Sequence, residues 1–118
     1  MRSKYFYTEV LGFEIIAENY RENRNSYKLD LKVDETTAIE LFFFPDAPPR
    51  NSYPEARGLR HLCFAVDDLD ETIKTLSQKG IVFEQIRIDE YTEKRFVFFE
   101  DPDGLPIELY EEEVGNRK

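Results

Sequence analysis

Residues 95–111, RFVFFEDPDGLPIELYE, have the clearest strand and turn pattern in the sequence. A run of β-forming residues leads into Asp101-Pro102-Asp103-Gly104, and a second run follows it. Pro fixes φ at the second position of a tight turn, and Gly accepts the positive φ that such a turn often needs. The stretch therefore predicts a β-hairpin with strands at residues 95–99 and 105–110.

The second strand of this hairpin contains the first candidate functional residue. Alternate side chains of a strand share a face, so Ile107 and Leu109 point one way and Glu108 and Tyr110 the other. A carboxylate among apolar neighbours is costly unless it is paired or bound to a cation. Glu108 therefore needs a partner.

Composition sets the class of protein. The 118 residues suit one α+β domain with a real core, and 41% of them are hydrophobic. A net charge of −9 argues against nucleic acid and against an anionic membrane as partners. Cys63 is the single cysteine, which excludes an internal disulfide and suits a reducing compartment. No apolar run suggests a membrane span or a signal peptide, so we expect a cytoplasmic protein.

Hydrophobic periodicity predicts the other elements. A first helix is expected to end at Gly12, and a second is capped by Asp68 and ends at Gly80. Proline-rich residues 46–58 read as a linker. In chain order, we expect a helix at 3–11, strands at 13–21, 26–33, 38–44 and 60–66, a helix at 68–79 and a strand at 81–88.

The two halves of the chain repeat each other. Aligning Gly12 with Gly80 also places Ile39-Glu40-Leu41 on Ile107-Glu108-Leu109, and the alignment needs no gap. This is the signature of an internal duplication. We therefore divide one domain, residues 1–118, into a first module (1–45), the linker, and a second module (59–113). Both modules place one Glu on the same face of their last strand.

The second module begins with a strand that has no counterpart in the first. His61 lies on that strand, before Gly80, and the position equally far before Gly12 falls upstream of Met1. We therefore expect the first module to lack its opening strand, through truncation or natively. Loss of that strand predicts an exposed edge at residues 38–44, and exposed strand edges template association. We accordingly expect a homodimer.

Three motifs together resemble the vicinal oxygen chelate superfamily, the group of glyoxalase I, bleomycin-resistance proteins and extradiol dioxygenases. The motifs are FYTEVLGF (residues 6–13), GLRHL (58–62) and DPDG (101–104) followed by IEL (107–109). The resemblance implies two βαβββ modules that form a cupped, mixed sheet around one divalent metal. It also implies a His, Glu, His, Glu ligand set, of which Glu40, His61 and Glu108 match the last three.

The resemblance further implies chemistry on a small α-oxo or hemithioacetal substrate. Nickel or zinc accepts imidazole and carboxylate ligands and stabilises an enediolate, while a carboxylate acts as base. Glu40 or Glu108 takes that role, and the sequence does not choose between them. Because one ligand has no match, we expect the metal to be bound weakly or to be absent.

Alternatives remain open at each step. His61 is otherwise a half-buried histidine satisfied by hydrogen bonds, and Glu40 and Glu108 are otherwise solvated strand residues. Three hypotheses for the function remain: a glyoxalase I-type lyase, a metalloenzyme of the same superfamily with another substrate, and a metal-free protein that binds small molecules. Neither the substrate, nor the metal, nor the number of chains that form one site follows from the sequence.

Overall fold

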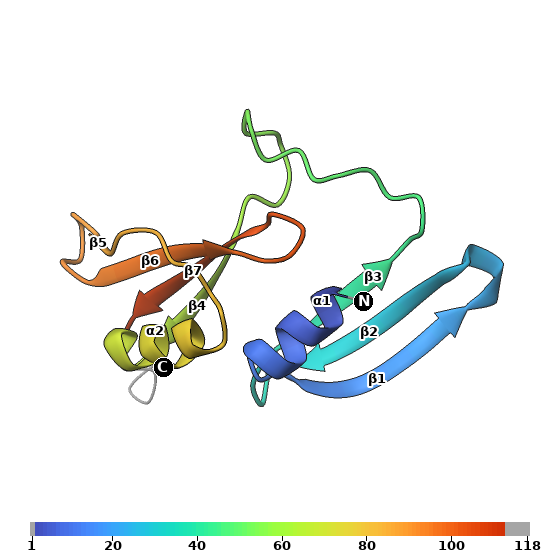
Figure 1. The fold of residues 1–118 in the computed structure, drawn as a ribbon, viewed down its shortest axis with the longest axis horizontal. Coiled ribbons are helices and arrows are strands. Elements are labelled where there is room, and N and C mark those ends of the chain that lie inside the picture. The colour runs from blue at the N-terminus through green and yellow to red at the C-terminus, as the bar shows by residue number, and fades with distance from the viewer. Residues whose placement is uncertain (1, 113–118) are drawn as a thin grey trace. The chain divides into compact units, whose positions relative to one another are not determined.

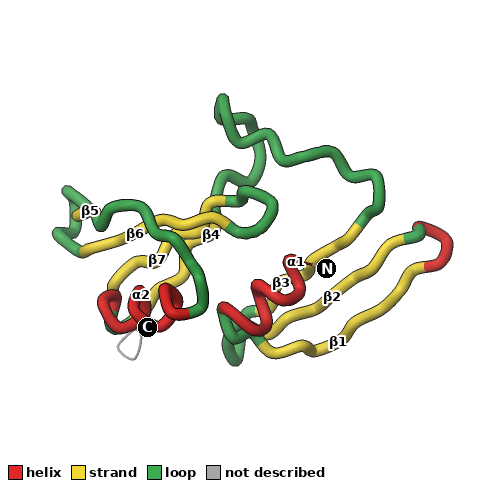
Figure 2. Tube along the Cα trace, viewed as in Figure 1, coloured by secondary structure: helices red, strands yellow, loops and turns green. Residues whose placement is uncertain are grey.

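Two β-sheets, one of three strands and one of four, form the frame of the protein. They are seen in a computed structural model that describes residues 2–112 (Figures 1 and 2). The sheets belong to two compact units, residues 1–49 and residues 50–118, and each unit is described by itself. The architecture is the expected α+β class.

The first unit is a helical segment followed by an antiparallel sheet of order β1-β2-β3. Its elements are α1 (Arg2–Tyr5), η1 (Phe6–Val10), β1 (Glu14–Arg21), η2 (Glu22–Arg24), β2 (Ser26–Lys32) and β3 (Ala38–Phe43). Leu29 and Leu31 of β2 are fully buried, as is Tyr7 of the helical segment at 1% exposure. The predicted apolar face of β2 therefore packs against the core through Leu29 and Leu31.

The first helix differs from its prediction in one respect. It starts as an α-helix, but from Phe6 to Val10 it widens into a π-helical turn. Gly12 then takes φ +85°, and the Phe13 N–H donates to the Tyr7 carbonyl at 3.0 Å. The predicted glycine stop is therefore confirmed, although the last turn is wider than an α-helix would make it.

The second unit places β4 (Leu62–Val66) parallel to β7 (Pro106–Glu111) in a sheet of order β4-β7-β6-β5. The other strands are β5 (Arg87–Ile88) and β6 (Arg95–Glu100), and α2 (Leu69–Gln78) covers one face (Figure 1). The core between them contains Leu69, Leu76, Val97, Phe99, Ile107 and Leu109.

The ends of α2 form as predicted. Asp68 caps the helix, because its Oδ1 accepts the Glu71 N–H at 3.0 Å. At the other end, the Ile81 N–H donates to the Leu76 carbonyl and the Gly80 N–H to the Ser77 carbonyl. This pair of bonds is a Schellman motif, and Gly80 supplies the left-handed residue at φ +93°.

The predicted strand at 81–88 is wrong for most of its length, because only Arg87–Ile88 is a strand. The Glu84 N–H still donates to the Phe98 carbonyl at 3.0 Å, but Arg87 pairs with Phe96, one register step away. An extra residue in one strand leaves a group unpaired and disrupts the ladder locally. The hydrogen-bonded strand, Arg87–Ile88, is therefore shorter than the segment 81–88 that the apolar pattern predicted.

The duplication is visible in the strand pairing. Leu29 pairs with Leu41 in the first unit, and their equivalents in the repeat, Val97 and Leu109, pair in the second. The register slip recurs as well, since β1 shifts against β2 between Ile15 and Ala17. Within residues 2–112, β4 has no counterpart in the first sheet, and β3 forms an edge there.

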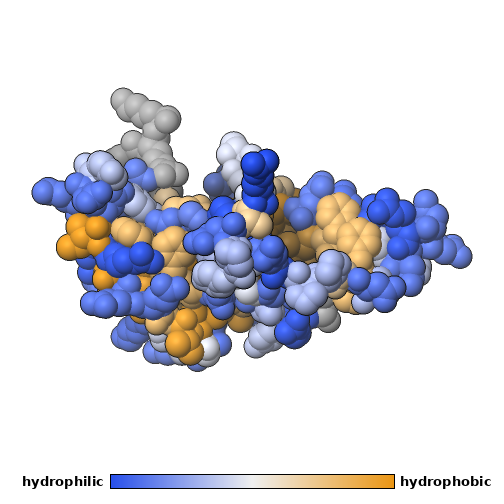
Figure 3. Space-filling view, turned by 90° about the horizontal axis from the view of Figure 1, so that it is seen from above, coloured by the Kyte–Doolittle hydropathy of each residue, from blue (hydrophilic) through white to orange (hydrophobic). Residues whose placement is uncertain are grey.

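Large apolar side chains also remain at the surface. Exposed examples are Ile15, Ile16, Phe42 and Phe43 in the first unit and Val82, Ile86 and Ile88 in the second. Orange residues therefore interrupt the blue surface in Figure 3. Among the described residues, no helix is long and apolar enough to cross a bilayer.

Candidate metal-binding site

Glu108 lies on the face of the second sheet that α2 leaves open. Its neighbours along β7, Ile107 and Leu109, are 0% and 3% exposed and belong to the core under α2. Strand alternation therefore turns Glu108 to the opposite face. Its side chain retains only 14% exposure there, so the carboxylate is largely removed from water.

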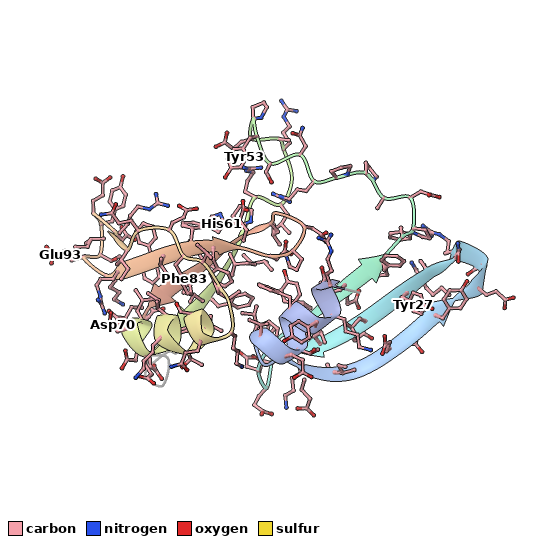
Figure 4. The ribbon with its side chains drawn as sticks, viewed as in Figure 1. Tyr27, Tyr53, His61, Asp70, Phe83 and Glu93 are labelled. Carbon is pink, nitrogen blue, oxygen red and sulfur yellow. The ribbon has the colours of Figure 1, made fainter. Side chains whose placement is uncertain are left out.

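His61 meets Glu108 on that face. Parallel pairing of β4 with β7 sets Cys63 beside Glu108, and His61 comes two residues before Cys63, on the same side. The His61 Nε2 lies 3.1 Å from the Glu108 Oε1. In Figure 4, His61 and Asp70 of α2 lie on opposite sides of the sheet. The structure therefore brings His61 and Glu108 together on this face.

Arginine contacts fix the backbone that carries His61. The Arg50 guanidinium donates to the carbonyl of Leu59 at 2.7 Å and to that of Arg60 at 2.9 Å. Arg60 in turn donates to the Ser52 carbonyl at 3.1 Å. These bonds hold the two residues before His61, so the imidazole is presented from an ordered segment.

The two donors suit a divalent metal. Two ligands about 2.1 Å from one zinc ion lie about 3 to 3.4 Å from each other, depending on the coordination angle. The observed separation of 3.1 Å between Nε2 and Oε1 lies in that range. An imidazole and a carboxylate are also donors that nickel and zinc accept. A direct hydrogen bond between His61 and Glu108 has the same geometry, so distance alone does not choose between the two.

An aromatic surface surrounds this pair. The His61 ring meets the Phe98 ring edge-on at 5.1 Å, and Phe96 lies next along β6. The Arg87 guanidinium lies over both phenylalanines, 5.3 Å from one ring and 5.2 Å from the other. Strand alternation predicts from the sequence that Phe96 and Phe98 share this face. The position of Arg87 was not predictable in the same way, because it depends on the shortened strand β5.

The far end of this face is closed by hydrogen bonds. The Tyr110 hydroxyl donates to Asp89 Oδ2 at 2.8 Å, and Thr92 also bonds that hydroxyl. The Tyr91 backbone N–H, together with the Tyr110 hydroxyl, lowers the pKa of Asp89 below its usual range. Tyr110 therefore ties the β5–β6 turn to the sheet, a role that the sequence did not reveal.

Glu40 lies in the first unit, where its side chain is 57% exposed. Its Oε2 is 3.4 Å from the Lys28 Nζ, and it sits opposite Asp30 across the β2–β3 pair. Hydrogen bonds to Asp30 and Glu40 raise the pKa of Lys28. Glu40 is thus paired with a lysine in its own unit, and its meeting with His61 and Glu108 stays a prediction. Within residues 2–112, no three His, Cys, Asp or Glu side chains form a metal cluster.

Comparison with known proteins identifies the family. The model of the glyoxalase/bleomycin resistance protein/dioxygenase superfamily matches residues 1–109. The chain belongs to this superfamily. It is 57% identical to the uncharacterized protein YwkD of Bacillus subtilis over 111 residues, 94% of this chain and 87% of that protein. A crystal structure of a glyoxalase family protein from Enterococcus faecalis is 49% identical, with a TM-score of 0.88, over 93% of this chain and 86% of that one.

Two less similar solved structures belong to proteins with different roles. The trypanothione-dependent glyoxalase I of Leishmania major is 26% identical over 93% of this chain and 76% of that one, with a TM-score of 0.70. TnmS3, an antibiotic binding protein from Streptomyces, is 25% identical over 95% of this chain and 85% of that one, with a TM-score of 0.68. Solved structures similar to this chain thus include both a glyoxalase I and an antibiotic binding protein.

Proposed function

We propose that the protein is a metal-dependent lyase or isomerase of glyoxalase I type, acting on a small α-oxo or hemithioacetal substrate. The observation that carries the proposal is the approach of His61 to Glu108 on the open face of the second sheet. A largely buried carboxylate beside an imidazole needs a cation or a hydrogen-bond donor. In a superfamily with glyoxalase I members, a divalent metal is the cation with a chemical role.

Each residue then has a defined task. In this proposal His61 and Glu108 hold the metal, nickel or zinc, and Glu40, of the same chain or of a second copy, is the third ligand. A metal held there would supply Lewis acidity to the substrate carbonyl. One carboxylate, from Glu40 or Glu108, takes the proton from the carbon next to the carbonyl and returns it to the neighbouring carbon. The rings of Phe96 and Phe98 keep water from the substrate's apolar part.

We also propose a cytoplasmic homodimer. The strand β3 forms an edge of the first sheet within the described chain, and Phe42 and Phe43 on it are 43% and 40% exposed. An apolar edge without lysine favours pairing with another chain. A second copy is therefore the partner we expect along β3.

A second candidate is a metal-free protein that binds or sequesters a small molecule. The observation in its favour is the guanidinium of Arg87 above Phe96 and Phe98, which makes an aromatic surface with a fixed cation. Similarity to the antibiotic binding protein TnmS3 supports this candidate. In that case, His61 and Glu108 form a simple hydrogen bond that shapes the surface.

The test is an assay of lactoylglutathione formation from methylglyoxal and glutathione, run on protein loaded with nickel or with zinc. The proposal predicts turnover that disappears on treatment with a chelator and in Glu108→Gln. Glu100→Gln, an exposed carboxylate on the neighbouring strand β6, is the matched control and keeps full activity. Stoichiometric metal without lactoylglutathione formation would indicate another substrate, whereas no metal uptake would favour the binding protein.

A further inference from the structure

A hollow in the first unit has features that the proposed function does not use. It opens where the β1–β2 turn faces the chain that leaves β3, and its volume is about 490 Å³. The hollow is shallow and largely open to solvent, so a ligand would rest against its lining without being enclosed. Its lining residues are Arg24, Asn25, Phe44, Pro45, Asp46, Ala47 and Pro48.

Two arginines lie over aromatic rings here: Arg24 and Phe44 line the hollow, and Arg21 lies beside it. The Arg24 guanidinium lies 5.7 Å from the centre of the Phe44 ring. The Arg21 guanidinium lies 4.8 Å from the Phe42 ring and 5.7 Å from the Phe44 ring, and the two rings stack at 6.2 Å. Cation–π contact holds a guanidinium flat on a ring and leaves its N–H groups free to bind an anion.

Neither arginine is neutralised within the described chain. Arg21 donates through Nε to the Ser26 hydroxyl at 3.1 Å, and no described carboxylate forms an ion pair with Arg21 or Arg24. By contrast, Arg95 is held by Asp70 and Glu111, both at 2.9 Å. Although the whole chain has a net charge of −9, these two guanidiniums make a locally positive surface. Asp46 is the one acid in the lining, and it faces the same hollow.

The duplication supplies an internal comparison. The equivalents of Arg21 and Arg24 in the second module are Asp89 and Thr92. There the Tyr110 hydroxyl bonds to both side chains, so this corner of the second unit is closed by its own polar groups. The first unit instead carries two cations and an open hollow at the same place. The difference favours a ligand over a structural role for Arg21 and Arg24.

The turn that carries these arginines is pre-organised. Asn25 adopts a left-handed conformation with φ +44°, and its N–H donates to the Glu22 carbonyl at 3.2 Å. The Asn25 Oδ1 accepts the Tyr20 hydroxyl at 2.8 Å. Because the turn is held in this way, Arg24 is presented to the hollow at little ordering cost.

We propose that this hollow binds a small organic anion with a planar apolar body, an aryl carboxylate in the simplest case. The carboxylate meets the guanidiniums of Arg21 and Arg24, and the planar body lies against Phe44 and the prolines. The site lies wholly within the first unit and needs no metal. It is therefore independent of the reaction proposed for His61 and Glu108.

The experiment titrates the chelator-treated, ¹⁵N-labelled full chain with 2-naphthoate and follows backbone amides by NMR. Shift changes are expected to cluster at residues 21–26 and 44–48. Arg24→Gln and Arg21→Gln each weaken binding by about tenfold or more, because each removes a charge-assisted hydrogen bond. Lys32→Gln, which removes the same charge at the far end of β2, leaves the affinity unchanged.

The neutral amide 2-naphthamide separates anion recognition from simple apolar binding. The proposal predicts binding at least about tenfold weaker than that of 2-naphthoate. Equal binding of the two compounds, an unchanged affinity in Arg24→Gln, or shift changes centred on His61 would each overturn it. Arg24 is exposed, so the folded state of its variant is not at risk.

Discussion

The same substitution at two repeat-equivalent positions measures how differently the two sheets are buried. Leu41 and Leu109 occupy the same place in the two modules, and each pairs with a fully buried residue, Leu29 or Val97. Leu109 is 3% exposed, since it lies under α2 on a strand flanked by β4 and β6, whereas Leu41 is only half-buried on the edge strand β3. The pair therefore compares a leucine on a covered interior strand with its equivalent on an edge strand.

The expected losses follow from burial. Leu109→Ala removes a buried side chain and leaves a cavity, which costs about 3 kcal/mol within the usual range of about 2 to 5 kcal/mol. Leu41→Ala removes a side chain that water already reaches, so we expect about 1 to 1.5 kcal/mol. For a chain of this size, about 1 kcal/mol shifts Tm by roughly 4 °C, so the variants should melt roughly 12 °C and 5 °C below wild type.

The assay is urea unfolding followed by circular dichroism, with the midpoint and the m-value fitted separately. It is run at low and at high protein concentration. If a second copy pairs along β3, the cost of Leu41→Ala rises with concentration toward that of Leu109→Ala, because the partner strand buries Leu41. Equal losses of stability in the two variants, at a dilution where the protein is monomeric, would show that burial of the two leucines does not set the cost.

Two further variants test local structure. Gly80→Ala should destabilise the protein by about 1 to 2 kcal/mol in urea unfolding. Because φ is +93° at Gly80 and an added Cβ meets no atom within 4 Å, this cost comes from backbone conformation alone. Ser77→Ala at the same helix end is the control, and unchanged stability in Gly80→Ala would contradict the Schellman geometry. Glu111 accepts from Arg95 and from the Leu69 N–H, and these bonds lower its pKa from the ordinary 4.5. A depressed folded-state pKa gives stability that is present above about pH 4.5 and is lost as the pH falls through the folded-state pKa. Glu111→Gln should therefore have a lower Tm than wild type at pH 7, and its Tm should fall less on acidification. If the Tm of both proteins falls in parallel as the pH is lowered, Glu111 does not stabilise the fold through its carboxylate.

Periodicity and turn chemistry predicted most of the fold. The hairpin around Gly104, the Asp68 cap and the buried faces of β2, β6 and β7 follow from local rules, because each depends on neighbours in sequence. The π-helical turn after Tyr5 and the loss of most of the strand before Ile88 do not. Both reflect one-residue adjustments of hydrogen bonding, which leave hydrophobic periodicity unchanged.

The candidate site was predictable only in part. The repeat and the strand faces pointed to Glu108 and His61, and parallel pairing of β4 with β7 brings them together. The sequence did not reveal that Lys28 pairs with Glu40, because β2–β3 pairing sets which side chains of that face meet. Arg87 escaped notice for a similar reason, since its place above Phe96 depends on the slipped register of β5.

Calorimetric titration of the chelator-treated protein with nickel and with zinc measures whether His61 and Glu108 hold a divalent metal. We expect one metal site per chain and release of protons on binding. Metal affinity should fall by about tenfold or more in both His61→Ala and Glu108→Gln, while Glu100→Gln binds the metal as wild type does. Wild-type protein that takes up neither metal, or His61→Ala that binds with unchanged affinity, would contradict the claim and leave the pair as a hydrogen bond.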